Sequence, residues 1–184
     1  MRRPITPQLL TVIAFWRAII DPMIALTSSV CIDAPAEAVW DWLARLEDIR
    51  LWSEPILEAR CPEGSDRGVG AERTCRLTGG ITVHEHWVAW DEGRSFTYEG
   101  TGVPFVARAR NTWSVRPQGE RALLTSEAEV MLKGGRLGRL LEPITSRQAL
   151  RMGRRSLAAF KYLVEHGEPP NARHAMLAPA PMAC

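Results

Sequence analysis

The sequence predicts an α+β domain in which a curved antiparallel sheet of about seven strands lies against one long C-terminal helix. Short segments with alternating apolar and polar residues, separated by turn residues, fill most of residues 26–132. One long segment with helical spacing follows at residues 143–167. Because the strands come first and the main helix comes last, we expect a single antiparallel sheet with the helix packed on it.

The final helix is predicted from the spacing of its apolar positions. Steps of three and four residues, which place side chains on one face of a helix, separate Leu150, Gly153, Leu157, Phe160 and Val164. Pro143 suits the first turn of this helix, and Gly167 suits its end. A helix of this length extends for more than about 30 Å. Its apolar stripe therefore needs an extended apolar surface, which a curved sheet provides.

The segments ahead of the helix are assigned in order. The first strand covers residues 26–32, and a short helix follows it, because Pro35 favours a first turn and Asp33 can cap it. A second short helix at residues 46–52 ends before Pro55. The other strands are predicted at residues 56–61, 70–77, 81–90, 95–99, 107–115 and 122–132.

The composition is that of an ordinary globular chain. Its 184 residues are enough for one domain with a core and few for two. Charged residues make up 24% and the net charge is only +2, so the charge does not favour nucleic acid binding. The four cysteines form no CxxC pair and have no histidine at zinc-ligand spacing. We interpret them as reduced thiols of a cytoplasmic protein, with one disulfide as the alternative.

The chain is predicted to divide into an N-terminal extension, a domain and a disordered tail rich in alanine and proline, at residues 1–22, 23–168 and 169–184. Within the extension, residues 9–20 are apolar apart from Thr11 and Arg17, and they are too few for a membrane span of about 20 residues. We interpret them as a loosely attached amphipathic helix, or as sequence ahead of a true start at Met23. A membrane-surface anchor is the alternative.

The period of two along residues 81–90 predicts which side chains point at the helix. The more apolar face carries Ile81, Val83, Glu85, Trp87 and Ala89, and the opposite face carries Thr82, His84, His86, Val88 and Trp90. The first face is expected to point inward. A three-residue turn at residues 78–80 sets Arg73 opposite Glu85. A two-residue turn would instead set Thr74 opposite Glu85 and would place polar and apolar side chains on the same face of the hairpin. We therefore predict a partly buried Arg73–Glu85 ion pair, because an unpaired buried carboxylate is costly.

The last two strands follow the same period. Their inward side chains are predicted to be Ala107, Ala109, Asn111, Trp113, Val115, Leu124, Ser126, Ala128, Val130 and Leu132. On the outer face, Arg108 and Arg110 are predicted near Glu127 and Glu129, as solvated cross-strand pairs worth about 0.2–1 kcal/mol each. Alanines on the inner face leave space, while tryptophan and tyrosine line it and each offer one donor.

Several segments, in this order, resemble a known family: VCIDAPAEAVWDWL, IRLWSEPILEA, GVGAERTCRL, VHEHWVAWDEGRSFTYEG and the terminal helix. Their order and spacing are similar to those of the polyketide cyclase/dehydrase branch of the START-like (SRPBCC) superfamily, from about Met23 to Glu168. The resemblance implies the helix-grip fold, a seven-stranded antiparallel sheet wrapped around a C-terminal helix and enclosing a cavity. Members bind or transform hydrophobic molecules such as polyketides, lipids, sterols and plant hormones.

Glu85 is the main functional candidate. The resemblance places it where the related plant abscisic acid receptors have a pocket glutamate that binds polar groups of the ligand. A buried carboxylate also suits a general acid or base, and the remaining alternative is one half of a structural ion pair. Ligand contacts are predicted for residues that line the expected interior: Arg73, Glu85, Trp87, Tyr98, Asn111, Trp113, Trp52 and Gly153.

No metal or cofactor is expected. His84 and His86 share a strand face, but that face is predicted to point outward, and the strand holds no residue that completes a ligand set on it. The serines, cysteines and histidines form no recognisable nucleophile–base order. Residues 133–138, KGGRLG, are rich in glycine but lack the pattern of a phosphate-binding loop.

Three functional hypotheses follow. The leading one is a cytoplasmic domain that carries or sequesters a small hydrophobic or aromatic ligand, such as a polyketide or a lipid. The second is an enzyme of the polyketide cyclase/dehydratase type, in which Glu85 transfers protons while Arg73, Tyr98 and Asn111 orient a carbonyl. The third is a membrane-associated adaptor that uses residues 9–20.

Overall fold

A computed structural model of the chain describes residues 23–133 and 135–171, and within residues 135–146 and at 148 it describes only the course of the helix. The elements in chain order are β1 (Met23–Ile32), α2 (Ala36–Leu43), the 3-10 helix η1 (Leu46–Leu51), β2 (Ile56–Arg60), β3 (Glu72–Leu77), β4 (Thr82–Asp91), β5 (Ser95–Thr101), β6 (Val106–Gln118), β7 (Arg121–Leu132) and α3 (Gly135–His166).

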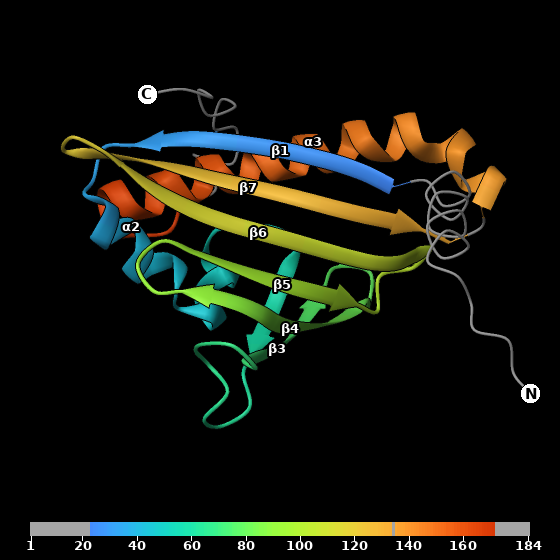
Figure 1. Cartoon of the computed structure of the whole chain (residues 1–184), viewed down its shortest axis with the longest axis horizontal. Helices are drawn as coiled ribbons and strands as arrows, with labels where there is room; N and C mark the ends of the chain where they lie inside the picture. Colours follow the sequence, from blue (N-terminus) through green and yellow to red (C-terminus); the bar gives the residue numbers. More distant parts are fainter. Residues whose placement is uncertain (1–22, 134, 172–184) are drawn as a thin grey trace, which may run out of the picture.

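In the described part of the chain, seven strands form one antiparallel sheet in the order β1-β7-β6-β5-β4-β3-β2. Figure 1 shows a curved sheet, with α3 running along it beside β1 and α2 at one end. Two short helices follow β1, and the long helix comes last. The predicted α+β class with a helix-grip arrangement is therefore confirmed.

The long helix starts earlier than predicted. The sequence predicts its first turn at Pro143 with a loop before it, whereas α3 begins at Gly135. That prediction relied on the preference of proline for a first turn, since a proline inside a helix removes one hydrogen bond. Leucine and arginine, both good helix formers, fill most of residues 136–141. This run is helical despite the proline that follows it.

A bulge in β4 reverses the predicted orientation of its last residues. The register with β5 shifts between Trp87 and Ala89, so one extra residue interrupts the period of two. Ala89 is exposed, while the ring of Trp90 stacks on Phe96 with centroids 5.3 Å apart. The prediction that Ala89 points inward and Trp90 outward is therefore wrong. Ahead of the bulge, Trp87 is fully buried as predicted.

A second bulge lies at the start of β6, where the register with β7 shifts between Val106 and Arg108. It leaves Ala107 exposed, so the prediction that this side chain points inward is wrong. Arg108 forms an ion pair with Glu99 of β5 rather than with the predicted carboxylates of β7. Arg110 lies directly opposite Glu129 in the register, as predicted.

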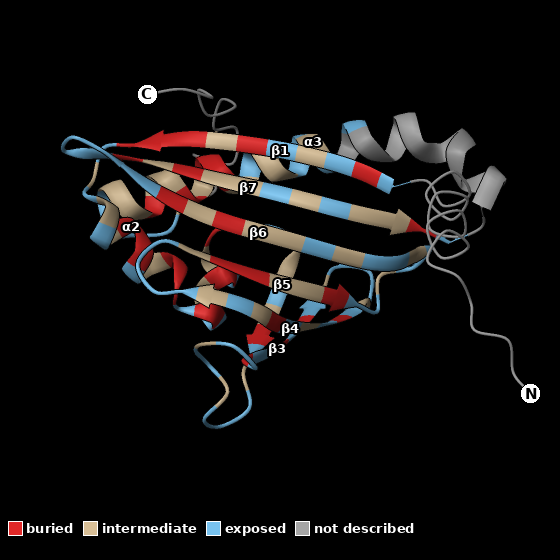
Figure 2. Cartoon of the chain, viewed as in Figure 1, coloured by how far each residue is buried: buried red, intermediate tan, exposed pale blue. Residues whose placement is uncertain are grey.

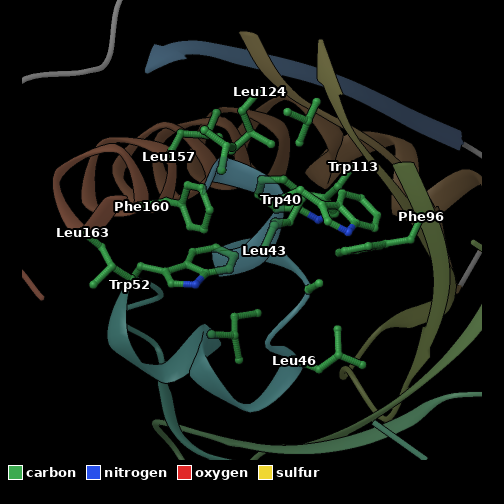
Figure 3. Packing of buried hydrophobic residues seen from close by; sticks show 14 of the residues in the cluster. Trp40, Leu43, Leu46, Trp52, Phe96, Trp113, Leu124, Leu157, Phe160 and Leu163 are labelled. Atoms are coloured by element: carbon green, nitrogen blue, oxygen red, sulfur yellow. The ribbon is translucent and has the colours of Figure 1, made fainter. Parts of the chain in front are cut away.

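Buried residues gather at the end of the sheet near α2 (Figure 2). Trp52 lies between Trp113 and Phe160, with ring centroids 5.6 Å and 5.1 Å away. Figure 3 shows these rings between α3 and the sheet. Trp40 of α2 packs on Phe96, with centroids 5.9 Å apart. Aromatic contacts of this kind add about 0.5–1.5 kcal/mol each to the free energy of burial, so this end of the interior is closely packed.

Glu92, in the turn after β4, connects three segments through its carboxylate. Trp40 Nε1 donates to Oε1 at 2.7 Å, and Trp90 Nε1 donates to Oε2 at 2.8 Å. Arg67, in the loop between β2 and β3, forms an ion pair with the same group. Hydrogen bonds from Arg67, Trp90 and Trp40 lower the pKa of Glu92 to about 2. This cluster, the Glu92 clamp, holds α2 and the β2–β3 loop to the end of the sheet.

Two predicted regions lie outside the described residues: residues 1–22, with the proposed adaptor segment 9–20, and residues 172–184 of the tail. None of the helices in the described part of the chain combines the length and the apolar character that a membrane span requires.

Cys61 and Cys75 are free thiols, as interpreted from the sequence, whereas Cys31 is disulfide-bonded. The interpretation of reduced thiols is therefore wrong for Cys31.

We expect Glu92→Gln to lower the melting temperature at neutral pH, measured by circular dichroism. Folding depresses the pKa of Glu92 from 4.5 to about 2. Its contribution to stability is therefore fully present above 4.5 and is lost as the pH falls toward 2. The wild type should lose more of its melting temperature over this range than the variant. Glu120→Gln, in the exposed turn between β6 and β7, is the control. Identical acid sensitivity of wild type and Glu92→Gln would contradict the clamp.

Candidate functional site

The candidate site lies in the middle of the inner face of the sheet, where paired positions of neighbouring strands form two rows. The first, the Glu85 row, contains Arg73, Glu85, Gly100, Ala109 and Val130. The second, the Tyr98 row, contains Trp87, Tyr98, Asn111 and Ala128. Residues in one row are direct cross-strand neighbours, so their side chains interact across the sheet.

Arg73 and Glu85 form the predicted ion pair. Arg73 Nε donates to Glu85 Oε2 at 2.7 Å, and the two side chains are only 4% and 9% exposed. Arg73 Nη1 also donates to the backbone carbonyl of Leu46 in η1. The guanidinium carbon lies 5.0 Å from the centroid of the Trp87 ring, a cation–π contact. The register of the β3–β4 hairpin, with Arg73 opposite Glu85, is confirmed.

The charges of this pair are stabilised by each other. Burial by itself lowers the pKa of Arg73, but the Glu85 carboxylate acts in the opposite direction, and the pKa of Arg73 lies above its ordinary value. The Cys75 thiol donates to Glu85 Oε2 at 3.5 Å. Burial raises the pKa of Cys75 to about 12, so this thiol stays protonated and is a poor nucleophile. Among the described residues, no donor is bonded to the second oxygen of Glu85, Oε1.

The hydroxyl of Tyr98 ends a short chain of hydrogen bonds. Ser126 Oγ donates to Asn111 Oδ1 at 3.0 Å, and Asn111 Nδ2 donates to the Tyr98 hydroxyl at 3.3 Å. Burial and the Glu85 carboxylate raise the pKa of Tyr98 to about 12, against the effect of hydrogen bonds from Asn111 and Trp113. The phenol therefore keeps its proton at neutral pH.

Small residues leave space beside Glu85 and Tyr98. Gly100 lies directly opposite Glu85, and a Cβ added there would lie 3.8–3.9 Å from its nearest neighbours, which is ordinary contact distance. Ala109 and Ala128 present only a methyl group, and both are half-buried although they lie on the inner face. Figure 2 shows β6 and β7 changing from buried to half-buried away from the α2 end. The inner face is therefore closely packed at the α2 end and only half-buried where the two rows cross β6 and β7.

Away from the two rows, the described residues form two further hollows. One of about 450 Å³ lies on the outer side of β1, β6 and β7, between Thr27, Arg110 and Glu129. The other, of about 510 Å³, lies between η1 and the β2–β3 loop, with Arg45 and Asp66 in its walls. Charged and polar side chains line much of both hollows, so neither has the mainly apolar lining that is typical of small-molecule sites.

The described residues contain no group of three or more histidine, cysteine or acidic side chains placed to hold a metal ion. His84 and His86 are exposed on the outer face of β4, as the period of two predicted. The ring nitrogen Nδ1 of His84 lies 3.1 Å from the hydroxyl of Thr74, a solvent-exposed cross-strand hydrogen bond.

The sequence profile of a family described as polyketide cyclase/dehydrase and lipid transport matches residues 23–165. The chain belongs to this family. The resemblance noted in the sequence is thereby confirmed. A comparison with curated protein sequences found no match.

Solved structures that share the fold of this family member have low sequence identity to it. A truncated norcoclaurine synthase from Thalictrum flavum is 15% identical with a TM-score of 0.62, over 80% of this chain and 97% of that chain. An aromatase/cyclase from a Streptomyces species is 18% identical with a TM-score of 0.60, over 81% and 100%. A protein from Thermobifida fusca is 24% identical with a TM-score of 0.60, over 77% and 95%. At these identities the likeness shows the helix-grip fold.

In this polyketide cyclase/dehydrase family member, five of the predicted ligand contacts lie in the two rows: Arg73, Glu85, Trp87, Tyr98 and Asn111. Trp113, Trp52 and Gly153 lie outside the two rows. Trp52 packs on Trp113 from the end of η1, and a Cβ on Gly153 of α3 would lie 3.8 Å from Ser28 Oγ. The roles of all these residues as ligand contacts stay predictions.

The indole N–H of Trp87 has no hydrogen-bond partner among the described residues, and the side chain is fully buried. An unsatisfied buried donor costs about 1–3 kcal/mol. The ring lies 5.0 Å from the Tyr98 ring, measured between centroids. The Tyr98 row therefore contains one indole donor that the described protein leaves unused.

Sequence reasoning did not name three parts of this site. Gly100 interrupts a strand, and a glycine inside a strand is a recognised signal of a bend or a close approach, so this signal was available. Ser126 was placed on the inner face by its period but was not assigned a partner. The carbonyl of Leu46 carries no signal in the sequence, because every residue has one.

We expect Glu85→Leu to lower the free energy of unfolding by about 3–5 kcal/mol, because it leaves the buried Arg73 guanidinium without a counter-ion. Urea denaturation at neutral pH measures this loss. A double variant that combines Arg73→Met with Glu85→Leu should recover most of it, since apolar replacement of a whole buried pair is often close to neutral.

The control for this comparison is Glu58→Leu, which removes a carboxylate from the exposed pair with Arg60 on β2. It should change the stability little, because exposed ion pairs are screened by water. If Glu85→Leu is as stable as the wild type, Arg73 does not depend on its partner.

Proposed function

We propose that this protein binds a small hydrophobic or aromatic molecule between α3 and the inner face of the sheet, as a carrier or a sequestering protein. The observation that carries the proposal is the part of the inner face where the side chains of Ala109 and Ala128 are small and only half-buried. Only a few polar groups, chiefly those of Glu85 and Tyr98, face this space. Mainly apolar walls with few fixed polar groups are typical of small-molecule sites.

The comparisons support this class of ligand. The family description includes both polyketide cyclases and lipid transport, and polyketides and lipids are largely apolar. One of the solved norcoclaurine synthase structures is a complex with dopamine and hydroxybenzaldehyde, which are small aromatic molecules. Native mass spectrometry of the protein purified from its own host tests the proposal directly. We expect a bound small molecule that is released when the protein is denatured.

We expect Ala109→Leu to weaken the binding of 2-ethylnaphthalene, a purely apolar probe, by about tenfold or more, which corresponds to about 1.4 kcal/mol. The larger side chain would occupy the space beside Gly100 and Glu85. Titration followed by tryptophan fluorescence measures the dissociation constant. Ala107→Leu, two residues earlier on β6, is the matched control, because Ala107 is exposed. Unchanged affinity in Ala109→Leu would exclude the two rows as the binding site.

The second candidate function is a cyclase or dehydratase, favoured by a carboxylate and a protonated phenol on neighbouring strands. Glu85 would remove a proton from a carbon next to one carbonyl of the substrate. The resulting enolate carbon would attack a second carbonyl of the same molecule, and the oxygen of that carbonyl would take the proton of Tyr98. Protonated Glu85 would return a proton to Tyr98, and loss of water would then leave a double bond in the new ring.

The probe 1-[2-(2-oxopropyl)phenyl]ethanone tests this second candidate, because its aldol closure with loss of water yields a fluorescent methylnaphthol. If Glu85 only moves protons, Glu85→Gln should abolish turnover while the dissociation constant changes by no more than a few-fold. If Glu85 is a ligand contact, Glu85→Gln should weaken binding while the fold survives. No acceleration of ring closure by the wild type over buffer would reject the enzyme hypothesis for this class of substrate.

A further inference from the structure

The hydrogen bonds around Tyr98 leave its own proton without an acceptor. The phenol oxygen accepts a hydrogen bond from Asn111 Nδ2 at 3.3 Å. Because an amide nitrogen can only donate, this neighbour uses a lone pair of the oxygen and does not accept its proton. Among the described residues, no group accepts the O–H of Tyr98.

The amide of Asn111 connects Ser126 to Tyr98. The Ser126 hydroxyl donates to Asn111 Oδ1 at 3.0 Å, and the amide nitrogen faces the Tyr98 hydroxyl. The ring of Tyr98 is held from the other side by Trp87, at 5.0 Å between centroids, and by the guanidinium of Arg73, 5.9 Å from the ring centroid. The phenol is thus held by neighbours on several strands, and the Asn111 amide nitrogen donates to its oxygen and leaves its proton free to point elsewhere.

Tyr98 also stands at the partly open part of the interior. It is half-buried, and its neighbours along the row and the next row include Ala128 and Ala109, which leave space. A directed donor in a mainly apolar site discriminates strongly between ligands, because an oxygen acceptor gains a hydrogen bond there and a hydrocarbon of the same shape does not.

We propose that the Tyr98 hydroxyl donates a hydrogen bond to a carbonyl oxygen of the ligand, so that the site selects aromatic or polyketide-like ketones over hydrocarbons of the same shape. This inference rests on the proposed function, since it concerns the same site. It goes beyond that function by naming the functional group that the ligand carries and the atom that recognises it. Asn111 and Ser126 are then positioning residues that act through Tyr98.

Two probes of nearly equal shape test the inference: 2-acetylnaphthalene, which has a ketone, and 2-ethylnaphthalene, which has none. Wild-type protein should bind the ketone about three- to tenfold more tightly, the range expected for one net hydrogen bond. In Tyr98→Phe the ratio of the two dissociation constants should fall to about one, because the substitution keeps the ring and removes only the hydroxyl donor. The ratio is measured within each variant, so a general change of the site cancels.

Tyr162→Phe is the matched control, because Tyr162 is the other tyrosine of the chain and stacks on His166 at the end of α3. It should leave the ratio unchanged. Infrared spectroscopy of the wild-type complex gives a second readout that needs no variant. The C=O stretch of bound 2-acetylnaphthalene should move to lower wavenumber than in hexane, as a hydrogen bond requires.

The outcomes separate the two proposals. If the wild type binds neither probe, the proposed function fails and this inference fails with it. If it binds both equally, or if the carbonyl stretch does not move, ligand binding stands and the role of Tyr98 is overturned. A preference that persists in Tyr98→Phe also overturns it, and assigns the contact to another donor such as the indole N–H of Trp87.

Discussion

The buried guanidinium of Arg73 constrains the centre of this sheet more than any other group. A charge at this depth is stable only with a counter-ion and with its donors satisfied. Glu85 supplies the counter-ion, and the carbonyl of Leu46 accepts a second hydrogen bond. These contacts join β3, β4 and η1. A carboxylate therefore stands on the inner face for a structural reason.

The ion pair also determines the chemistry of its surroundings. The charge of Glu85 contributes to the raised pKa of Tyr98, so the phenol remains a donor. The guanidinium covers one face of the Trp87 ring. Toward α2, the rings of Trp52 and its neighbours fill the interior (Figure 3). The protein thus combines an end packed with aromatic rings with a polar centre that is held by contacts between neighbouring strands.

Some of these features were accessible from local patterns. Only one register of the β3–β4 hairpin keeps charged and apolar side chains on separate faces, so the opposition of Arg73 and Glu85 was predictable before any coordinates. The same alternation placed Asn111 and Ser126 on the inner face. The alternation failed at Ala89, which follows the bulge in β4, and at Ala107, which lies within the bulge of β6. A bulge interrupts the period of two without a clear sequence signal.

By itself, the sequence determined the class of fold, the order of the strands along the chain and the inward side of most of them, because alternation, turn length and helical spacing are properties of neighbouring residues. The tertiary structure alone decided the bulges, the start of α3, the Leu46 carbonyl that meets Arg73 27 residues away, and the hydrogen bond from Asn111 to the Tyr98 hydroxyl. Most of these depend on which atoms from distant segments come within hydrogen-bond distance, and that distance is set only when the sheet closes around the helix.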